Sequence, residues 1–230
     1  MSEALAAFVR AHLRVEPVAF VPELLLYQAE EPIGLWELTE GEYRSDQPPP
    51  FWAFAWAGGQ GLARYLLDHP AEVAGRSVLD LASGSGLTAV AAARAGAATV
   101  RAVEVDATAS AAIALNAVAN KVRLEVTLAD VLDQGVSELG GASVVLAGDV
   151  FYSKAMAARM LNFLRRAARD GTDVLVGDPG RAYFPGEYFT AISHYEVPVR
   201  YELESTLVRT VTVWRINPRG AARKPSVDRD

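Results

Sequence analysis

Residues 77–86 constrain the fold of this chain more than any other stretch. They read Ser-Val-Leu-Asp-Leu-Ala-Ser-Gly-Ser-Gly. The short apolar first half predicts a buried β-strand, and the second half predicts a tight turn that opens into an alanine-rich helix through Ala95. Gly84 and Gly86 carry no Cβ that would keep a ligand from the backbone, and the N-terminus of the helix offers unpaired N–H groups. The stretch therefore predicts a cradle for a nucleotide-like ligand.

The spacing of the glycines leaves two kinds of ligand open. Residues 84–89 satisfy the loose Gly-x-Gly-x-x-Gly/Ala pattern of dinucleotide sites, which is weak when it stands alone. A dinucleotide loop places its first glycine at the strand end, whereas here Asp80 lies inside the strand and the glycines come four and six residues later. The order Asp-x-Ala-x-Gly-x-Gly resembles motif I of the seven-strand methyltransferases, with Ala82 at the usual first glycine. That resemblance implies that S-adenosylmethionine is bound by Asp80, Ser83, Gly84 and Gly86.

The composition limits the class of protein. A chain of 230 residues, about half of them apolar, suffices for one α/β domain with a substantial core. Without cysteine there is no disulfide, no thiolate metal site and no cysteine nucleophile. A net charge of −6 argues against nucleic acid as a partner. Because no apolar run approaches the roughly 18 residues of a membrane span and no signal peptide is visible, we expect a cytoplasmic protein with no membrane or metal partner.

The first 50 residues are expected to form an arm that packs on the core. The apolar spacing over residues 3–13 predicts a short amphipathic helix. Three prolines within residues 16–36 forbid a long helix and predict an extended arm, and residues 45–50 predict a stiff polyproline-like linker. The chain thus divides into an arm over residues 1–50, a methyltransferase domain over 51–216 and a polar tail over 217–230 that we expect to be disordered.

Residues 51–61 form a second informative segment, which is dense in aromatic residues and ends in glycines. The segment reads Phe-Trp-Ala-Phe-Ala-Trp-Ala-Gly-Gly-Gln-Gly. Such density is typical of a core, but a glycine pair follows Trp56 closely and leaves bare backbone beside a flat ring. We expect Trp56 and Gly58 to contact the cofactor, with a core role for Trp56 as the alternative. A turn over residues 58–61 would then precede a helix over 62–67.

Downstream of the cradle, strands alternate with helices, which predicts a mostly parallel sheet. The strand over residues 99–105 carries Glu104, about 20 residues past Gly84, the distance at which an acid reaches ribose hydroxyls. A carboxylate suits that role because it accepts two O–H bonds at once. Asp106 is expected to cap the next helix. Asp130 follows the next predicted strand, and we expect it to accept the adenine amino group, with a simple loop role as the alternative.

The strand over residues 142–148 is expected beside the cradle strand, where ligands of open α/β sheets collect. It is followed by Asp149-Val150-Phe151-Tyr152. An Asp-Val/Ile-Phe-Tyr element at this point resembles the signature of the seven-strand protein-lysine methyltransferases. That resemblance implies that Asp149 captures and orients a substrate lysine. It also implies that Tyr152 is a wall or a hydrogen-bond partner for the lysine.

Motifs along most of the chain carry a more specific resemblance. They are Pro-Phe-Trp-Ala at residues 50–53, Trp-Ala-Gly-Gly-Gln at 56–60, Arg-Tyr-Leu-Leu-Asp at 64–68, Gly-Asp-Val-Phe-Tyr at 148–152 and Gly-Asp-Pro-Gly-Arg at 177–181. Together they resemble the lysine methyltransferases of the electron-transfer flavoprotein β-subunit, with departures at Ala57 and Ala82. The resemblance implies a Rossmann-like α/β fold whose seven-stranded, mostly parallel sheet has an antiparallel last strand. It also implies a class I S-adenosylmethionine-dependent enzyme that methylates a protein lysine, with that flavoprotein β-subunit as the substrate.

The last part of the chain is expected to complete the sheet. The pattern predicts a helix over residues 153–169, a strand over 172–177, a short connection over 185–192, and a hairpin of strands over 197–201 and 206–216. His194 precedes that hairpin without a second ligand-type residue at a matching spacing, so we expect a structural role for it.

Other functions share parts of this pattern. A ribosomal protein, or a small molecule such as nicotinamide, is an alternative methyl acceptor, because motif I does not report on the acceptor. A nucleic-acid aminomethylase would show Asn/Asp-Pro-Pro-Tyr/Phe where this chain has Asp-Val-Phe-Tyr. A non-catalytic dinucleotide-binding module is the remaining alternative, and binding of S-adenosylmethionine against NAD distinguishes it.

Overall fold

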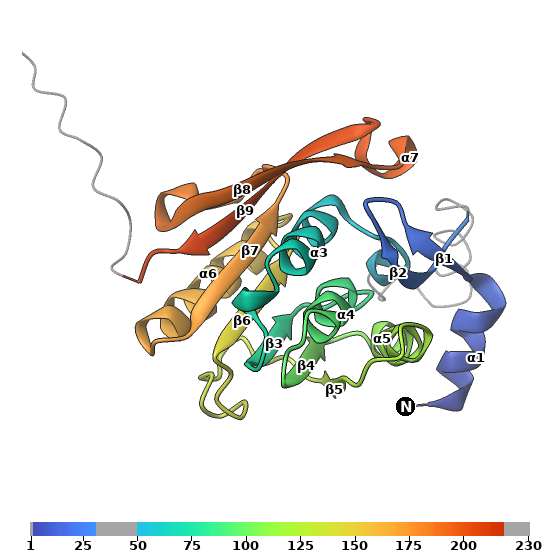
Figure 1. Cartoon of the computed structure of the whole chain (residues 1–230), viewed down its shortest axis with the longest axis horizontal. Helices are drawn as coiled ribbons and strands as arrows, with labels where there is room; N and C mark the ends of the chain where they lie inside the picture. Colours follow the sequence, from blue (N-terminus) through green and yellow to red (C-terminus); the bar gives the residue numbers. More distant parts are fainter. Residues whose placement is uncertain (1, 31–49, 219–230) are drawn as a thin grey trace, which may run out of the picture.

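The computed structural model describes residues 2–30 and 50–218. One seven-stranded sheet runs through the molecule, with helices packed on both of its faces (Figure 1). Its strands are β3 Ser77–Leu81, β4 Thr99–Glu104, β5 Glu125–Leu128, β6 Val144–Gly148, β7 Asp173–Asp178, β8 Phe189–Pro198 and β9 Val208–Ile216. They lie in the spatial order β5-β4-β3-β6-β7-β9-β8.

The directions of the strands confirm the predicted fold class. Strands β3 to β7 run parallel, whereas β9 runs antiparallel to both of its neighbours, β7 and β8. The chain builds outward from β3 through β4 to β5 and then returns to place β6 on the other side of β3. At such a reversal, ligands of open α/β sheets bind outside the carboxyl ends of the strands. The fold is therefore the expected Rossmann-like one, and it directs attention to the carboxyl ends of β3, β4 and β6.

Helices cover both faces because successive strand residues point to opposite sides of the sheet. Val78 of β3 lies in the apolar cluster formed with α3, α4 and α5, and its neighbour Leu79 lies in the cluster formed with α6. Within residues 2–30 and 50–218, no helix combines the length and apolar content of a membrane-crossing segment. The helices around the sheet are η1 Phe51–Ala53, α3 Ala57–Asp68, η2 Pro70–Glu72, α4 Leu87–Arg94, α5 Ala107–Ala119, α6 Lys154–Arg169, η3 Gly186–Tyr188 and α7 Tyr201–Glu204.

The N-terminal segment contains the expected helix and then a hairpin. Its elements are α1 Glu3–His12, β1 Arg14–Val18 and β2 Val21–Gln28. The two strands pair antiparallel, so residues 14–28 of the expected extended arm are extended and form a hairpin. Residues 31–49, with the rest of that arm and most of the predicted linker over 45–50, lie outside the described residues, as do residues 219–230 of the predicted tail.

Two asparagines of α5 attach this hairpin to the core. Asn120 accepts a hydrogen bond from the backbone N–H of Leu25 (2.9 Å) and donates one to its carbonyl (2.6 Å). Asn116 accepts from the N–H of Tyr27 (2.7 Å) and donates to the carbonyl of Ser85 (2.8 Å). Because Ser85 belongs to the turn after β3, these bonds join the hairpin to the predicted cradle through α5.

The start of α3 differs from the prediction. The helix begins at Ala57, so the turn expected over residues 58–61 is helical. A Cβ built on Gly58 would lie 2.5 Å from the carbonyl oxygen of Gly177, so the glycine allows the helix backbone to approach β7. Glycine is needed here for close packing rather than for a turn, and sequence reasoning does not separate these two uses.

The strands at the end of the chain also differ from the prediction. Since β8 begins at Phe189, half of the connection expected over residues 185–192 is strand, and His194 lies within β8 rather than before the hairpin. The short helix α7 occupies part of the region between β8 and β9. The cause is that β8 is an edge strand with mostly exposed or half-buried side chains, and its register against β9 shifts partway along. Its alternation of apolar residues is consequently weak.

Candidate active site

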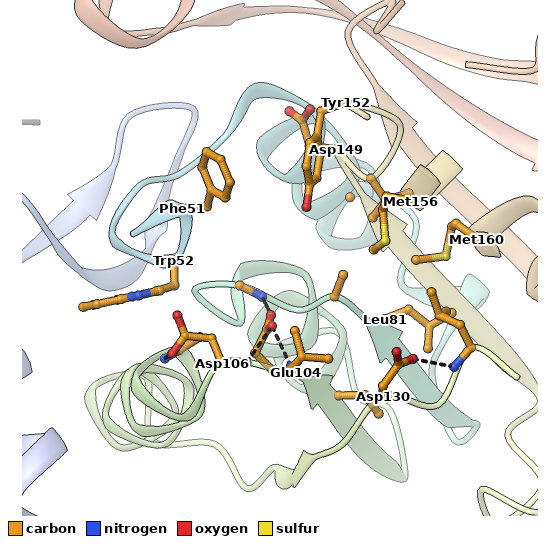
Figure 2. Close-up of a pocket in the computed structure, with 18 of the residues that line it drawn as sticks. Phe51, Trp52, Leu81, Glu104, Asp106, Asp130, Asp149, Tyr152, Met156 and Met160 are labelled. Atoms are coloured by element: carbon orange, nitrogen blue, oxygen red, sulfur yellow. Dashed lines mark hydrogen bonds between the residues drawn. The ribbon is translucent and has the colours of Figure 1, made fainter. Parts of the chain in front are cut away.

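A cavity of about 440 Å³ lies at the carboxyl ends of β3, β4 and β6. Figure 2 shows Glu104 and Asp130 on one side of it and Asp149 and Tyr152 on the opposite side. The cavity walls are largely apolar, with aliphatic, aromatic and methionine side chains. Of the ten residues predicted for the site, those that line the cavity are Trp56, Gly84, Glu104, Asp130, Asp149 and Tyr152. The structure therefore joins the turn after β3 and the acid after β6 in one cavity.

Asp80 and Ser83 are buried, stabilise the turn after β3 through hydrogen bonds, and do not line the cavity. Asp80 is completely buried and accepts hydrogen bonds from Ser83 Oγ and from Thr88 Oγ1, the latter at 2.6 Å. Burial raises the pKa of Asp80 to about 6, against the effect of both hydroxyl donors. Their polar atoms are used to hold the turn, and a direct contact of either residue with the cofactor stays a prediction.

The glycines of the turn have different roles. Gly84 adopts a φ of +55° and lines the cavity, and a Cβ added to it would meet nothing within 4 Å. Gly86 (φ +79°) is the residue before α4, and its Cβ would lie 3.1 Å from Ile113, so it serves the packing of the turn. Ala82, at the position where motif I has glycine, also has a positive φ of +49°. Its methyl group therefore costs backbone strain.

Glu104 receives a set of backbone N–H groups at the end of β4. Its carboxylate accepts from the N–H of Gly84 (2.8 Å), of Val105 (2.7 Å) and of Asp106 (3.3 Å). Burial raises its pKa, and these donors act in the opposite direction. Asp106 accepts from the N–H groups of Thr108 and Ala109, which confirms its predicted role as the cap of α5. Glu104 is thereby anchored to the turn after β3 and faces the same cavity.

Asp130 is paired with an arginine that sequence reasoning missed. Arg159 of α6 donates to both carboxylate oxygens of Asp130, at 2.8 and 3.0 Å, and to Asp133 at 2.8 Å. The guanidinium holds the pKa of Asp130 below its usual range. Both Asp130 and Arg159 line the cavity, so this ion pair forms part of its wall.

Trp56 lies between the cavity and a cluster of aromatic rings. It lines the cavity, its Nε1 donates to the carbonyl of Phe51 (2.8 Å), and its ring lies edge-on to Phe51 and Phe54. Gly58, by contrast, does not line the cavity. Its N–H donates to Asp149 Oδ2 at 2.9 Å, which ties the start of α3 to this acid, while the predicted cofactor contact of Gly58 stays a prediction.

Asp149 lies directly after β6 in a left-handed backbone conformation, with a φ of +61°. Its side chain is 7 % exposed, and Oδ1 accepts from Nε of Arg181 at 2.5 Å. Burial raises the pKa of Asp149, and the ion pair with Arg181 opposes that rise. Tyr152 stands at the rim, half exposed, with its ring centre 5.6 Å from that of Phe51. The two residues predicted to meet the lysine thus lie on the same side of the cavity.

Arg181 is the main functional candidate that the residue-level analysis did not single out. Its guanidinium lines the cavity and bridges Asp149 to Glu204, with bonds of 3.0 and 2.7 Å to the latter. The available signal was the motif at residues 177–181, which ends in this arginine. Nothing in that motif indicates which acid the arginine contacts, because its partners lie on other elements.

Comparison with known proteins places this geometry among methyltransferases. The family model described as Ribosomal protein L11 methyltransferase (PrmA) matches residues 65–156. The chain is 36% identical over 209 residues to the electron transfer flavoprotein beta subunit lysine methyltransferase of Danio rerio, covering 88% of this chain and 79% of that protein. It is 37% identical over 191 residues to the protein of the same name from Homo sapiens, covering 80% of this chain and 70% of that protein.

Solved structures show the same fold at low sequence identity. Magnesium protoporphyrin IX methyltransferase from Synechocystis, with bound S-adenosylmethionine, has a TM-score of 0.52 at 12% identity and covers 82% of this chain and 92% of its own. The tRNA (uracil-54, C5)-methyltransferase of Pyrococcus abyssi, in complex with S-adenosyl-L-homocysteine, has a TM-score of 0.50 at 17% identity and covers 69% of this chain and 38% of its own. At these identities the likeness concerns the fold alone.

Proposed function

This chain belongs to the family of electron transfer flavoprotein beta subunit lysine methyltransferases, and from that premise we propose that it methylates a lysine of such a beta subunit. It is an S-adenosylmethionine-dependent protein-lysine methyltransferase of class I, as the sequence motifs predicted. One observation carries the assignment of the site: Gly84 of the cradle and Asp149 line the same cavity. A methyl donor held at Gly84 and an acceptor lysine held at Asp149 would meet inside this cavity.

The residues of the cavity fit S-adenosylmethionine. The open backbone at Gly84 leaves room for a ligand, and two carboxylates, Glu104 and Asp130, face the same space as hydrogen-bond acceptors. We expect Glu104 to accept from a ribose hydroxyl and Asp130 to accept from the adenine amino group. Each acid already accepts three N–H donors, which leaves about one of the four acceptor positions of its carboxylate for the ligand. When bound, S-adenosylmethionine supplies a sulfonium methyl group that an amine can attack.

The protein contributes alignment and exclusion of water. Methyl transfer is an in-line displacement with a good leaving group, so the largely apolar walls and a fixed acceptor supply most of what is needed. The obstacle is the proton on the acceptor, because a free lysine has a pKa near 10.4 and its neutral form at pH 7 costs about 4.6 kcal/mol. We propose that Asp149 orients the lysine nitrogen and that Tyr152 at the rim forms a wall or hydrogen-bond partner beside it.

The test is methylation of a purified electron transfer flavoprotein beta subunit with isotope-labelled S-adenosylmethionine, followed by mass spectrometry to locate the methyl group. Asp149→Asn keeps the shape of the side chain and tolerates the left-handed backbone. We expect it to lower turnover by at least about 100-fold, a loss typical of removing a charged positioning contact. Affinity for S-adenosylmethionine should stay within a few-fold. Asp170→Asn, an exposed acid at the end of α6, is the matched control.

Two results would overturn these assignments. Near-normal turnover of Asp149→Asn would remove Asp149 from the mechanism. Label found on a small molecule, with none on the beta subunit, would reject the proposed substrate while leaving the cofactor site intact.

A ribosomal protein is the second candidate acceptor, because the matching family model is described as a ribosomal protein L11 methyltransferase. That match ends at residue 156, shortly after Asp149 and Tyr152, so it covers the cofactor side of the cavity and little of the chain beyond β6. Offering both proteins in one reaction separates the two acceptors, since label on the ribosomal protein alone would favour this second candidate.

A further inference from the structure

The charge of Asp149 is already matched by a neighbouring side chain. Nε of Arg181 donates to Asp149 Oδ1 at 2.5 Å, and the N–H of Gly58 donates to Oδ2 at 2.9 Å. The guanidinium also lies over the ring of Trp56, 5.8 Å from its centre, and lines the same cavity as Asp149. Arg181 therefore faces the space into which the acceptor lysine has to enter.

Arg181 is held rigidly from its far side. Its two terminal nitrogens bind both carboxylate oxygens of Glu204, which is buried and also pairs with Arg209 at 3.2 Å. The backbone N–H of Arg181 donates to Asp178 Oδ1 at 2.8 Å, so the turn that carries the arginine is fixed to the end of β7. Hydrogen bonds to Asp149, Glu204 and Asp178 therefore fix the position of the arginine in the site.

We propose that Arg181 is a positioning residue that offsets the charge of Asp149, so that the acceptor lysine is held as a neutral amine. This inference rests on the proposed function. An isolated carboxylate would favour the ammonium, which has no lone pair and cannot react. With Arg181 in place, Asp149 still accepts a hydrogen bond from the amine, but its pull on a positive charge is largely cancelled. The positive sulfonium of the cofactor then favours loss of the lysine proton.

The chemical balance of this step is simple. The incoming ammonium releases one proton to water as it enters the site. The amine nitrogen then uses its lone pair to form the new N–C bond, while the electron pair of the breaking C–S bond stays on sulfur. The product is a methylammonium, so one positive charge is conserved from the sulfonium to the lysine. No further reactant is needed.

The size of the effect follows from Coulomb's law. Two unit charges about 6 Å apart at an effective dielectric constant of about 20 interact by about two pKa units. Because Arg181 is partly exposed, with 20 % of its side chain accessible, solvent reduces this to about one unit or slightly more. Removing the cation should therefore raise the pKa of the bound lysine by about one to two units, and removing the anion Glu204 should lower it.

Other ionisable groups also face the cavity or the arginine, and all of them except Glu204 stay unchanged in the proposed variants. On the cavity side they are Glu104 of β4, Asp106, Asp130, Tyr152 before α6 and Arg159 of α6. On the far side of Arg181 they are Asp178 of β7, Glu204 of α7 and Arg209 of β9. The common background of these charges cancels when variants are compared with the wild-type protein at the same pH.

The experiment measures kcat between pH 6 and pH 10 at saturating concentrations of both substrates, with the methylated beta subunit as readout. For Arg181→Gln we expect the pKa that governs the acid limb to rise by about one to two units, so that activity is about 10- to 100-fold lower at pH 7 and recovers at high pH. For Glu204→Gln, which disturbs the same cluster, we expect this pKa to fall. Arg181→Lys keeps the charge and should leave the acid limb within about half a unit.

Equal loss of activity by Arg181→Gln at every pH would show a merely structural role and overturn the inference. A rise in the acid-limb pKa of Glu204→Gln would do the same, and this variant decides the matter if Arg181→Gln does not fold. Thermal unfolding and S-adenosylmethionine affinity of each variant report folding independently of catalysis. If the wild-type protein does not methylate the beta subunit, the proposed function fails; if it does and the acid limb does not move, only the role of Arg181 fails.

Discussion

Replacing Asp80 by asparagine tests what the buried carboxyl beneath the cradle contributes. Asp80 has no accessible surface, and burial raises its pKa from 3.8 to about 6 although Ser83 and Thr88 donate hydrogen bonds to it. Asparagine has the same shape and cannot ionise. Its oxygen can still accept from one hydroxyl, and its amide can donate to the other, because a hydroxyl both donates and accepts.

The sign of the effect follows from the direction of the pKa change. A carboxyl with a higher pKa in the folded chain than in the unfolded chain stabilises the fold only while it is protonated. Its contribution is complete below about pH 3.8 and is lost as the pH rises through about 6. The full contribution is about 3 kcal/mol, of which about half is present at pH 5 and almost none at pH 7.5. The stability of the wild-type protein relative to Asp80→Asn should therefore rise by about 1–2 kcal/mol between pH 7.5 and pH 5.

Urea unfolding followed by tryptophan fluorescence at several pH values measures this difference directly. Asp170→Asn, at an exposed position, should show no such dependence on pH. Parallel stability curves of the wild-type protein and Asp80→Asn from pH 7.5 to pH 5 would refute the reasoning. That result would mean that the carboxylate is well solvated by its hydrogen bonds and carries no burial penalty.

Two further substitutions test the turn after β3 and Glu104, which accepts a hydrogen bond from the N–H of Gly84 in that turn. Ala82→Gly relieves the strain of a methyl group in a left-handed backbone conformation, which costs the wild-type protein about 1–2 kcal/mol. It also raises the entropy of the unfolded chain, which lowers stability by about 0.5–1 kcal/mol. Urea unfolding should therefore show a net increase in the free energy of unfolding of about 0.5–1 kcal/mol. A loss of stability would contradict this. Glu104→Gln places an amide among three backbone N–H donors and removes a charged acceptor, so calorimetry should show S-adenosylmethionine binding about 10- to 100-fold more weakly. Unchanged affinity would exclude Glu104 as a cofactor ligand.

The features that local sequence patterns predicted are those that depend on neighbouring residues. The strand and turn at residues 77–86, the cap at Asp106 and the helix after Ser153 each have a signal within a few positions of the chain. The placement of Glu104 and Asp149 also follows, because parallel strands bring their carboxyl ends to one edge of the sheet. Such signals locate the cavity and its acids. The order of the strands was predicted from the resemblance of the motifs to a known family.

The features that were missed depend on contacts between distant parts of the chain. Residue 58 has to be glycine because a side chain there would collide with the carbonyl oxygen of Gly177. No sequence pattern around residue 58 distinguishes this packing requirement from a glycine in a turn. Arg181 could have paired with any nearby acid, and only the folded chain, which brings the end of β6 and α7 to the residues after β7, selects Asp149 and Glu204. Strand β8 lies at the edge of the sheet with few buried side chains, so its sequence carries little record of its start.

The side chain of Asn116 gives the N-terminal hairpin an importance that its position in the chain does not suggest. One amide group connects the backbone of Tyr27 with the backbone of Ser85, so a fragment that started at β3 would keep the bond to Ser85 but lose the bond from Tyr27. A fragment that is to keep both bonds has to include β1 and β2 and therefore begins near residue 14, well upstream of the first strand of the main sheet. Chimaeras between related enzymes should therefore take the hairpin β1–β2 and the turn after β3 from the same parent.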